Sequence, residues 1–529
     1  MFNIRQSGAV PDGRTLNTAA IAAAVKNCAD AGGGVVYVPP GDYLTGPIVL
    51  RSNVTLHLEA GAVIRFVQDS KHYPTVQSRW AGVEQHGFCP CVYGRDIENV
   101  ALTGRGILDG QGKYWWDIFC LPREKWPEAV RKRNAEFAAL NRDLFGLGHA
   151  GLGRPPLVHL RSCRNVRLEG LTHRNSPFWN THLVYCENVT VDDIKLENPG
   201  GAPNGDGLDI DSCRFVRVSN LFADVNDDAI CLKSGKNDDG RRVGKPCENV
   251  TIVNCTVKRG HGGVVIGSEV SGGIRNVTVS NCVFMDTDRG IRIKAARGRG
   301  GIVEDLRFTN IIMQNVVCPF VINKYYGTDV YAPAEPVSEN TPAFRNIHFD
   351  NISARNVRSA GFFAGLPELP FEGITLSNIA IQATREMCRE RDSVPFGEYF
   401  NEIPAMALNY EPIHGFYCRN VKDVSFSNVR IQTREGPAFV FENVEEIDLR
   451  GFRAVDPDAN APLISMENTS GALISECVCP SGPETFLALK GAETHSVSLS
   501  GNRLGTGAAF SAADDVPPNA VSVTAVPTP

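Results

Sequence analysis

The stretches "CRNVRLEG" (163–170), "CENVTVDD" (186–193), "CRFVRVSN" (213–220) and "CENVTIVN" (247–254) are four versions of one motif. In each version polar and apolar residues alternate, and β-branched residues occupy many of the apolar positions, which is typical of a half-buried strand. Related versions continue along the chain as "ENVALTG" (98), "RNVTVSN" (275), "EDLRFTN" (304), "RNIHFDN" (345), "EGITLSN" (372), "KDVSFSN" (422) and "EEIDLRG" (445).

The spacing of the motif predicts how these strands are arranged. Successive copies from 164 to 304 begin 23, 27, 34, 27 and 29 residues apart. A strand pattern that recurs at such intervals, with polar turns between, indicates a solenoid. Coils of this length made of short strands are typical of a parallel β-helix, in which each coil pairs with the next. Leucine-rich repeats are disfavoured because their leucine-asparagine consensus is absent. The sequence therefore predicts an all-β solenoid.

The cysteines fit the same stacking. The chain has 16 of them but no Cys-x-x-Cys pair. Cys163, Cys186, Cys213 and Cys247 each stand immediately before a copy of the motif. Cysteine in a strand behaves as a small buried hydrophobe. We therefore expect an internal row of thiols rather than a disulfide scaffold or a zinc site.

The two ends of the chain differ from the repeat. The stretch "TLNTAAIAAAVKNCADAGGG" (15–34) predicts one helix that starts at Asn17 or Thr18, stops at the glycines and caps the open end of the solenoid. We expect an amino-terminal cap with the first coils over 1–60, and the β-helix over 61–515. An insertion at 112–157 and a tail at 516–529 complete this organisation.

Composition excludes some classes of partner. With 43% hydrophobic residues, 21% charged residues and a net charge of −6, the chain has the make-up of a folded protein. The charge gives no case for nucleic acid or for an anionic membrane. No apolar run reaches the length of a signal peptide or a membrane span, which favours a cytoplasmic location. A secreted or periplasmic location would follow if a leader had been removed.

Two acidic clusters occupy equivalent places in neighbouring coils. When "DGLDID" (206–211) is aligned with "DAICLK" (228–233), Asp206 meets Asp228 and the apolar positions coincide. The same register continues into "GHGGVVIGS" (260–268), where His261 lies above Asp227, and then into "RGIRIKA" (289–295). Stacked coils are about 4.8 Å apart. The alignment therefore predicts that these groups share one face of the solenoid with Arg292 and Lys294.

Such a cluster is suited to acid–base chemistry. When carboxylates lie this close together, their mutual repulsion raises the pKa of one of them. The group with the raised pKa can act as an acid and the other as a base, as glycoside hydrolysis needs. For a single aspartate or histidine a structural role remains open, because solenoid turns favour aspartate and glycine. Lys233 aligns with Asp211 of the preceding coil, and the two could form an ion pair on the surface. The alternative is that Lys233 binds substrate.

Four short segments resemble the polygalacturonase family, glycoside hydrolase family 28. That family carries Asn-Thr-Asp-Gly, Gly- or Gln-Asp-Asp, Gly-His-Gly and Arg-Ile-Lys in this order, followed by a tyrosine. The matching segments here are "NGDG" (204–207), "NDD" (226–228), "GHG" (260–262), "RIK" (292–294) and "NKYYG" (323–327), the last offering Tyr325 or Tyr326.

The resemblance implies a right-handed parallel β-helix and an inverting hydrolase that needs no metal or organic cofactor. It assigns the general acid to Asp227, the activation of water to Asp206 and Asp228, and the tuning of the acid to His261. It assigns the substrate carboxylate to Arg292, Lys294 and a tyrosine, Tyr325 or Tyr326. We expect Asn204 and Lys233 to bind substrate as well. Gly205 and Asn226 depart from the family pattern, which puts the substrate specificity in doubt.

The expected substrate is an acidic oligosaccharide or polysaccharide. Arg292 and Lys294 favour a sugar carboxylate, and the loops 233–246 and 295–301 add further basic residues. Within the insertion, Trp115, Trp116 and Trp126 either stack on sugars or pack a core.

We expect α-1,4-linked galacturonic acid as the substrate, with cleavage from chain ends if the insertion closes the cleft. The alternatives are a rhamnogalacturonan hydrolase of the same family, a β-helix polysaccharide lyase and a non-catalytic glycan-binding solenoid. Paired aspartates beside an intact "GHG" favour hydrolysis over the last two.

Overall fold

The computed structural model describes residues 1–141, 154–327, 332–384, 415–433, 435–479, 482–505 and 508–524. It divides into two compact units, one made mainly of residues 1–265 and the other mainly of residues 275–529. Both are parallel β-helices, so the predicted fold class is confirmed. No helix among the described residues is long and apolar enough to cross a membrane.

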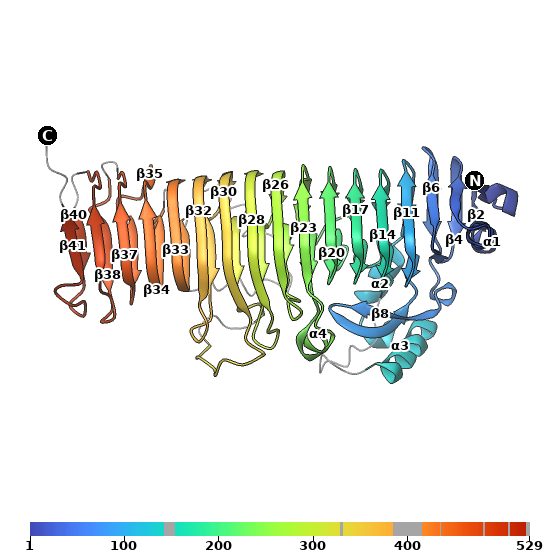
Figure 1. The fold of residues 1–529 in the computed structure, drawn as a ribbon, viewed down its shortest axis with the longest axis horizontal. Coiled ribbons are helices and arrows are strands. Elements are labelled where there is room, and N and C mark those ends of the chain that lie inside the picture. The colour runs from blue at the N-terminus through green and yellow to red at the C-terminus, as the bar shows by residue number, and fades with distance from the viewer. Residues whose placement is uncertain are drawn as a thin grey trace. The chain divides into compact units, whose positions relative to one another are not determined.

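The first unit is built from three rows of parallel strands, in which each strand pairs with its counterpart in the next coil. The repeated motif forms the first row, whose strands lie side by side in Figure 1. This row consists of β3 (Gly34–Val38), β6 (Val54–Leu58), β11 (Glu98–Gly104), β14 (Arg164–Glu169), β17 (Glu187–Asp192), β20 (Arg214–Ser219) and β23 (Cys247–Val253).

The second and third rows close each coil. The second row consists of β2 (Asp12–Leu16), β4 (Gly41–Thr45), β7 (Ala62–Phe66), β12 (Ile107–Asp109), β15 (Thr172–Arg174), β18 (Lys195–Glu197), β21 (Phe222–Asp224) and β24 (Thr256–Gly260). The third row consists of β5 (Ile48–Val49), β10 (Val92–Arg95), β13 (Val158–Arg161), β16 (Thr181–Val184), β19 (Leu208–Asp211), β22 (Asp228–Lys233) and β25 (Gly262–Ile266). The third row positions the acidic clusters.

Two ladders of side chains explain why the motif repeats. Inside, Val166, Val189 and Val216 stand in register and are at most 2% exposed, so the coils share one apolar core. At the corner, the motif asparagine has a positive φ, a conformation that asparagine tolerates better than most residues. Its amide bonds to the asparagine of the preceding coil, as Asn188 does to Asn165 at 2.8 Å.

The thiols follow the strands as predicted. Cys163, Cys186, Cys213 and Cys247 are all fully buried. The thiol of Cys186 donates to the carbonyl of Leu160 at 3.3 Å. None of the cysteines in the described part of the chain forms a disulfide.

The amino-terminal helix is α1 (Thr18–Asp30), which buries Ile21, Ala24, Val25 and Cys28 and packs on the first coil. Asn17 precedes the helix, but its side chain makes no capping bond. Its amide group exchanges hydrogen bonds with the backbone of Val10 at 2.7 and 3.1 Å instead. Short elements complete this end: β1 (Phe2–Asn3), η1 (Ile4–Ser7) and η2 (Ser70–His72).

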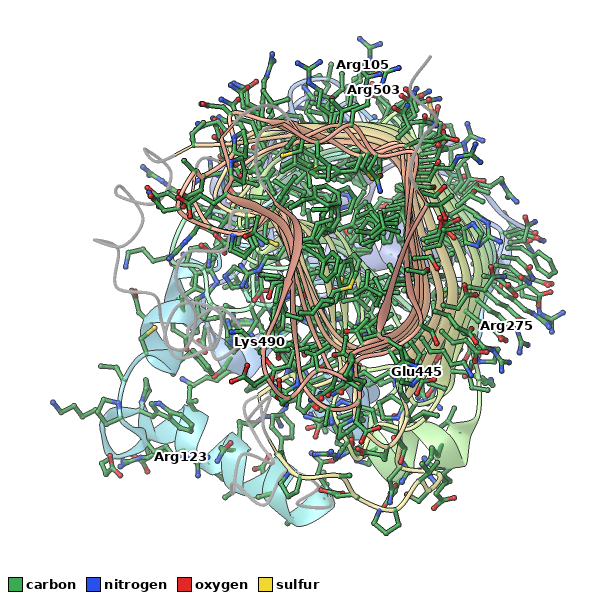
Figure 2. All side chains as sticks on the ribbon, turned by 90° about the vertical axis from the view of Figure 1, so that its left-hand side faces the viewer. Arg105, Arg123, Arg275, Glu445, Lys490 and Arg503 are labelled. Carbon is green, nitrogen blue, oxygen red and sulfur yellow. The ribbon has the colours of Figure 1, made fainter. Side chains whose placement is uncertain are left out.

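The second unit has the same architecture, with strands of up to 17 residues in its first coils. In Figure 2 side chains fill the inside of the coils, whereas the labelled Arg275, Glu445 and Arg503 of this unit lie outside. Its main row is β26 (Ile274–Thr287), β28 (Ile302–Gln314), β30 (Ala343–Val357), β32 (Phe371–Ala383), β33 (Phe416–Gln432), β34 (Phe439–Arg450), β37 (Ser470–Ser475), β39 (Val497–Ser500) and β41 (Val521–Thr524). The other strands are β27 (Arg289–Lys294), β29 (Cys318–Asn323), β31 (Gly361–Ala364), β35 (Arg453–Val455), β36 (Ile464–Glu467), β38 (Thr485–Lys490) and β40 (Ala508–Ala512).

The carboxyl end differs from the expected tail at 516–529. Its residues Val521–Thr524 form β41, which pairs in parallel with β39 and so extends the solenoid. Residues 525–529 lie outside the described part of the chain.

Candidate active site

The acidic clusters are brought together by the stacking of the third row. In the ladder between β19 and β22, Leu208 pairs with Ile230, which is the register predicted from the sequence. Just before these strands, the backbone N–H of Gly207 donates to the carbonyl of Asp228 at 2.9 Å. In the next coil, the N–H of His261 donates to the carbonyl of Asp227 at 2.9 Å. Three successive coils therefore place Asp206, Asp227–Asp228 and His261 one above another.

Asp227 and His261 are joined through their side chains as well. The imidazole Nδ1 lies 3.1 Å from the Asp227 Oδ1, and the same oxygen accepts the backbone N–H of Asp228 at 2.8 Å. The side chain of Asp227 is 18% exposed and that of His261 is 27% exposed, so both reach solvent. Asp227, Asp228 and His261 each offer an atom within 4.8 Å of the others, a spacing that could also hold a metal ion.

Asp206 lies deeper than Asp227. It is only 3% exposed, and one of its carboxylate oxygens is 4.0 Å from the Nζ of Lys233. Burial, together with the negative charges of Asp227, Asp209 and Asp228, raises the pKa of Asp206 well above the ordinary value, while Lys233 acts in the opposite direction. At least one carboxyl group of the site therefore holds its proton more tightly than a free aspartate does.

The expected surface pair of Lys233 and Asp211 is wrong about the surface, because both side chains are buried. The two residues are in register, but the Lys233 side chain is 4% exposed and its Nζ lies 3.6 Å from the Asp209 Oδ1. Its ammonium group also stands 4.7 Å from the ring centroid of Trp179. Asp211 has a different partner, described below.

The two departures from the family pattern have a local explanation in the loop before β19. A Cβ on Gly205 would stand 3.0 Å from the carbonyl oxygen of Ala202, so a threonine would crowd this loop. Asn226 fastens the same loop, because its Nδ2 donates to the Ala202 carbonyl at 3.0 Å and its Oδ1 accepts the N–H of Gly201 at 3.1 Å. Both departures therefore act on the same loop: Gly205 leaves room for its close turn, and Asn226 holds it by two hydrogen bonds.

Asn204 is held in the same loop. Its side-chain oxygen accepts from the guanidinium of Arg154 at 2.8 Å, and Arg154 is 1% exposed. The guanidinium also donates to the carbonyls of Pro177 and Pro203 at 2.8 and 2.6 Å. The substrate-binding role expected of Asn204 stays a prediction, and its amide oxygen is already engaged within the protein.

A hairpin that the sequence did not reveal covers the outer side of this row. Strands β8 (Thr75–Trp80) and β9 (Val83–Phe88) pair in an antiparallel manner. Arg79 of β8 lies 3.1 Å from the Asp211 carboxylate, and both side chains are fully buried. Glu84 of β9 forms ion pairs with Arg161 at 2.6 Å and with Arg242 at 3.0 Å. Charged groups thus hold the hairpin on β13, β19 and the loop that contains Arg242.

Buried histidines extend this polar layer. The Nδ1 atoms of His159 and His182 lie 3.1 Å apart, and the His159 Nε2 is 3.0 Å from the Ser78 hydroxyl. Burial lowers the pKa of both histidines, so both rings are neutral at neutral pH. His159 and His182 are single histidines in different coils, so no sequence motif indicated that they would be buried together.

The described part of the insertion is helical. It contains α2 (Lys113–Phe119), η3 (Arg123–Lys125) and α3 (Glu128–Leu140), whereas residues 142–153 lie outside the described part of the chain. Trp115 is 3% exposed and packs edge-on against Phe88 of the hairpin, with ring centroids 5.1 Å apart. Trp126 is 5% exposed. Both therefore pack a core, and only Trp116 is more accessible.

The second unit contains the cations and tyrosines. Arg292 and Lys294 are on β27, on the opposite side of the strand from the buried Ile291 and Ile293. The guanidinium carbon of Arg292 lies 5.6 Å from the ring centroid of Tyr326, and the Nζ of Lys294 lies 4.9 Å from it. These three residues form one cationic and aromatic cluster.

The two candidate tyrosines have different surroundings. Tyr325 is 2% exposed and belongs to an apolar cluster with Phe362 and Tyr417. Tyr326 is half-buried beside the two cations. The geometry therefore favours Tyr326 over Tyr325 for contact with substrate.

The basic loops are engaged within the protein. In the loop 233–246, helix α4 (Asn237–Val243) pairs Arg241 with Asp238, and Arg242 with Asp239 and Glu84. In the loop 295–301, Arg297 pairs with Glu368 at 2.7 Å. These contacts favour a structural role for the three arginines over the attraction of substrate.

Comparisons with known proteins show to which family this chain belongs. Residues 148–394 match the model described as "Glycosyl hydrolases family 28". A Vitis vinifera protein named "Probable polygalacturonase" is 31% identical over 384 residues, which cover 71% of this chain and 72% of that protein. The chain belongs to glycoside hydrolase family 28. The family predicted from the sequence is confirmed, and so is the prediction of a glycoside hydrolase.

Other relatives of this family 28 hydrolase come from bacteria. The "Exo-poly-alpha-D-galacturonosidase" of Dickeya chrysanthemi is 28% identical, over 81% of this chain and 71% of that protein. The crystal structure of the hyperthermoactive exopolygalacturonase from Thermotoga maritima is 35% identical and has a TM-score of 0.63, over 72% of this chain and 87% of that one. Residues 1–67 of the family 28 hydrolase also match a model described as "Rhamnogalacturonase A/epimerase, pectate lyase-like".

Proposed function

We propose that this protein hydrolyses α-1,4-linked galacturonic acid in pectin or oligogalacturonides, with inversion of configuration and from chain ends. The stack of Asp206, Asp227–Asp228 and His261 on three coils carries the proposal, because it supplies carboxyl groups in different environments beside one imidazole. The relatives named as polygalacturonases and galacturonosidases support galacturonan as the substrate.

In this mechanism Asp227 protonates the leaving oxygen of the glycosidic bond. Its contact with His261 and its partial exposure suit a group that meets the substrate. Asp206 and Asp228 bind the water that attacks the opposite face of the sugar, and one of the two carboxylates takes its proton. Arg292, Lys294 and Tyr326 bind a sugar carboxylate, since charge-assisted bonds to such groups are strong and directional.

Action from chain ends is supported by the hairpin β8–β9. Arg79 ties the hairpin to Asp211, in the strand that follows Asp206, and Trp80 stacks on Phe178 with centroids 5.4 Å apart. A fixed wall so close to the acidic stack restricts how far a polysaccharide can extend. Two of the relatives are named as exo-acting enzymes.

Incubation of the protein with oligogalacturonides of defined length tests the proposal. We expect free galacturonic acid as the first product on anion-exchange chromatography, with no rise in ultraviolet absorbance from unsaturated ends. Asp227→Asn abolishes the product, whereas Asp238→Asn, at an exposed aspartate on α4, retains it. Early products longer than one sugar contradict action from chain ends, and growing absorbance contradicts hydrolysis.

Rhamnogalacturonan is the second candidate substrate. It is favoured by the match of residues 1–67 to the rhamnogalacturonase-type model and by the altered loop of Gly205 and Asn226. Release of sugars from rhamnogalacturonan fragments, but not from oligogalacturonides, supports this alternative. The cytoplasmic location stays a prediction, which cell fractionation tests.

A further inference from the structure

Lys233 is the last residue of β22 and occupies an unusual place for a lysine. Its side chain is 4% exposed, and its Nζ lies 3.6 Å from the Asp209 Oδ1 and 4.0 Å from the Asp206 Oδ2. Lysine is rarely buried to this degree unless it is paired. The ammonium group is therefore shared between two carboxylates, one of which belongs to the acidic stack.

The surroundings fix the position of this ammonium group. Its Nζ stands 4.7 Å from the ring centroid of Trp179, which favours a cation on the ring face. Trp179 is itself held, because it packs edge-on against His182 with centroids 4.8 Å apart and stacks on Phe178 at 4.9 Å. Lys233 also lies in the parallel ladder opposite Asp211, which sets its backbone.

The charges around Asp206 explain what Lys233 does there. Burial favours the protonated form of Asp206, and so do the negative charges of Asp227, Asp209 and Asp228. The positive charge of Lys233 favours the ionised form instead. His182 on β16 carries no charge at neutral pH, because burial lowers its pKa. A carboxyl group that holds its proton cannot accept one from water. Without the ammonium group, Asp206 would therefore be protonated over a wider range of pH.

We propose that Lys233 is a positioning residue that favours the ionised form of the Asp206 carboxylate and orients it toward the attacking water. This inference rests on the proposed function, and it replaces the substrate-binding role expected of Lys233 from the sequence. A substrate carboxylate at the same ammonium group would have to compete with Asp206 and Asp209, which already lie within 4.0 Å of it.

Three variants test the inference through the pH dependence of kcat/KM on oligogalacturonides. Lys233→Met keeps the length of the side chain and removes the charge. We expect the acidic limb of the profile to move upward by about one pH unit or more, the usual effect of losing an opposite charge at this range. Lys233→Arg retains the charge and leaves the limb near its original place. Asp209→Asn removes a carboxylate that opposes ionisation, so the limb moves downward.

A second readout does not depend on catalysis. In protein labelled with ¹³C at the aspartate carboxyl carbons, the Asp206 resonance is assigned by its loss in Asp206→Asn, and its titration midpoint is followed. We expect the midpoint to rise in Lys233→Met and to fall in Asp209→Asn. If the wild type hydrolyses no oligogalacturonide, the proposed function fails, and these midpoints still decide the electrostatic role of Lys233.

A matched control comes from the second unit. Lys324 is also fully buried, but its Nζ donates to the carbonyl of Leu369 at 2.8 Å and lies over Phe371. Lys324→Met is expected to lower stability and to leave the acidic limb in place. The inference is overturned if Lys233→Met shifts neither the limb nor the midpoint, or if it only raises KM. It is also overturned if Asp209→Asn shifts them upward.

Discussion

His261 is fastened to Asp227 twice, once through the backbone and once through the side chain. Its N–H donates to the Asp227 carbonyl at 2.9 Å, and its Nδ1 lies 3.1 Å from the Asp227 Oδ1. The first bond joins the backbones of two successive coils, so the solenoid itself positions the imidazole against the acid. The ring cannot turn away from Asp227 without breaking its side-chain contact.

Replacement of this histidine should slow the reaction more than it weakens binding. We expect His261→Gln to lower kcat about 100-fold, the lower end of the effect of a positioned proton-transfer group, with little change in KM. Steady-state kinetics on trigalacturonate measure both constants. His348→Gln, at a half-buried histidine that bonds Asn346, is the control and retains activity. An unchanged kcat in His261→Gln would exclude a role in tuning the acid.

The buried pair of Arg79 and Asp211 should be essential to stability. Both side chains are fully buried, so Arg79→Met removes the guanidinium group that lies 3.1 Å from the buried Asp211 carboxylate. We expect a loss of about 3–5 kcal/mol in the free energy of unfolding, measured with urea. The double variant Arg79→Met/Asp211→Asn should recover part of this loss. A double variant that is less stable than Arg79→Met would contradict the pairing.

The two neighbouring tyrosines should separate binding from stability. Tyr326→Ala removes the ring that lies beside Arg292 and Lys294, and we expect KM to rise about 10-fold with an unchanged fold. Tyr325→Ala opens a cavity in an apolar cluster and should cost about 3–5 kcal/mol. Steady-state kinetics give the KM of both variants, and thermal unfolding gives their stability. The reverse outcome would place Tyr325, not Tyr326, at the substrate.

Buried histidines predict a loss of stability in acid. Burial lowers the pKa of His173 to about 3, whereas an unfolded histidine titrates near 6.5. Above about pH 6.5 neither state is protonated, and below it the unfolded state alone gains the proton. Each such histidine then lowers the free energy of unfolding by about 1.4 kcal/mol for every pH unit below about 6.5, until the pH reaches its pKa in the folded protein.

Thermal unfolding at pH 7 and pH 4.5 measures this effect. We expect the difference in Tm between the two values to be smaller in His173→Gln than in the wild type, because glutamine does not titrate. An equal difference in both proteins would assign acid unfolding to other groups.

A chelator should leave activity unchanged. The resemblance to family 28 implies no metal, although Asp227, Asp228 and His261 are close enough to hold one. Hydrolysis of oligogalacturonides is measured before and after dialysis against EDTA. Activity that disappears and returns with Ca²⁺ or Zn²⁺ would assign these three residues to a metal centre.

The fold and the acidic stack could be predicted because both depend on repetition. Alternation places Val189 and Val216 inside, and the same alternation carries Asp206 onto Asp228 when two coils are aligned. Parallel strands pair residue by residue, so one correct register fixes the neighbours as well. The motifs were therefore sufficient to place the catalytic candidates on adjacent coils.

The hairpin β8–β9 could not be predicted in the same way. It belongs to no coil, and Arg79 and Asp211 are 132 residues apart, so no local pattern joins them. Lys233 was assigned to a surface pair or to substrate for a related reason. Alternation places its side chain on the outer side of the strand, but in the structure its ammonium group is buried over Trp179 and beside Asp209.

The asparagine at the corner of each coil has a consequence for how such a chain can change. Asn188 bonds Asn165 across 23 residues, and Asn351 bonds Asn310 across 41 residues, so the corner contact is indifferent to the length of the intervening loop. Each doubling of a flexible loop costs only about 0.6 kcal/mol. Evolution can therefore lengthen the loops beyond the corner while the coils keep their register. New specificities can arise in this way without the scaffold being redesigned.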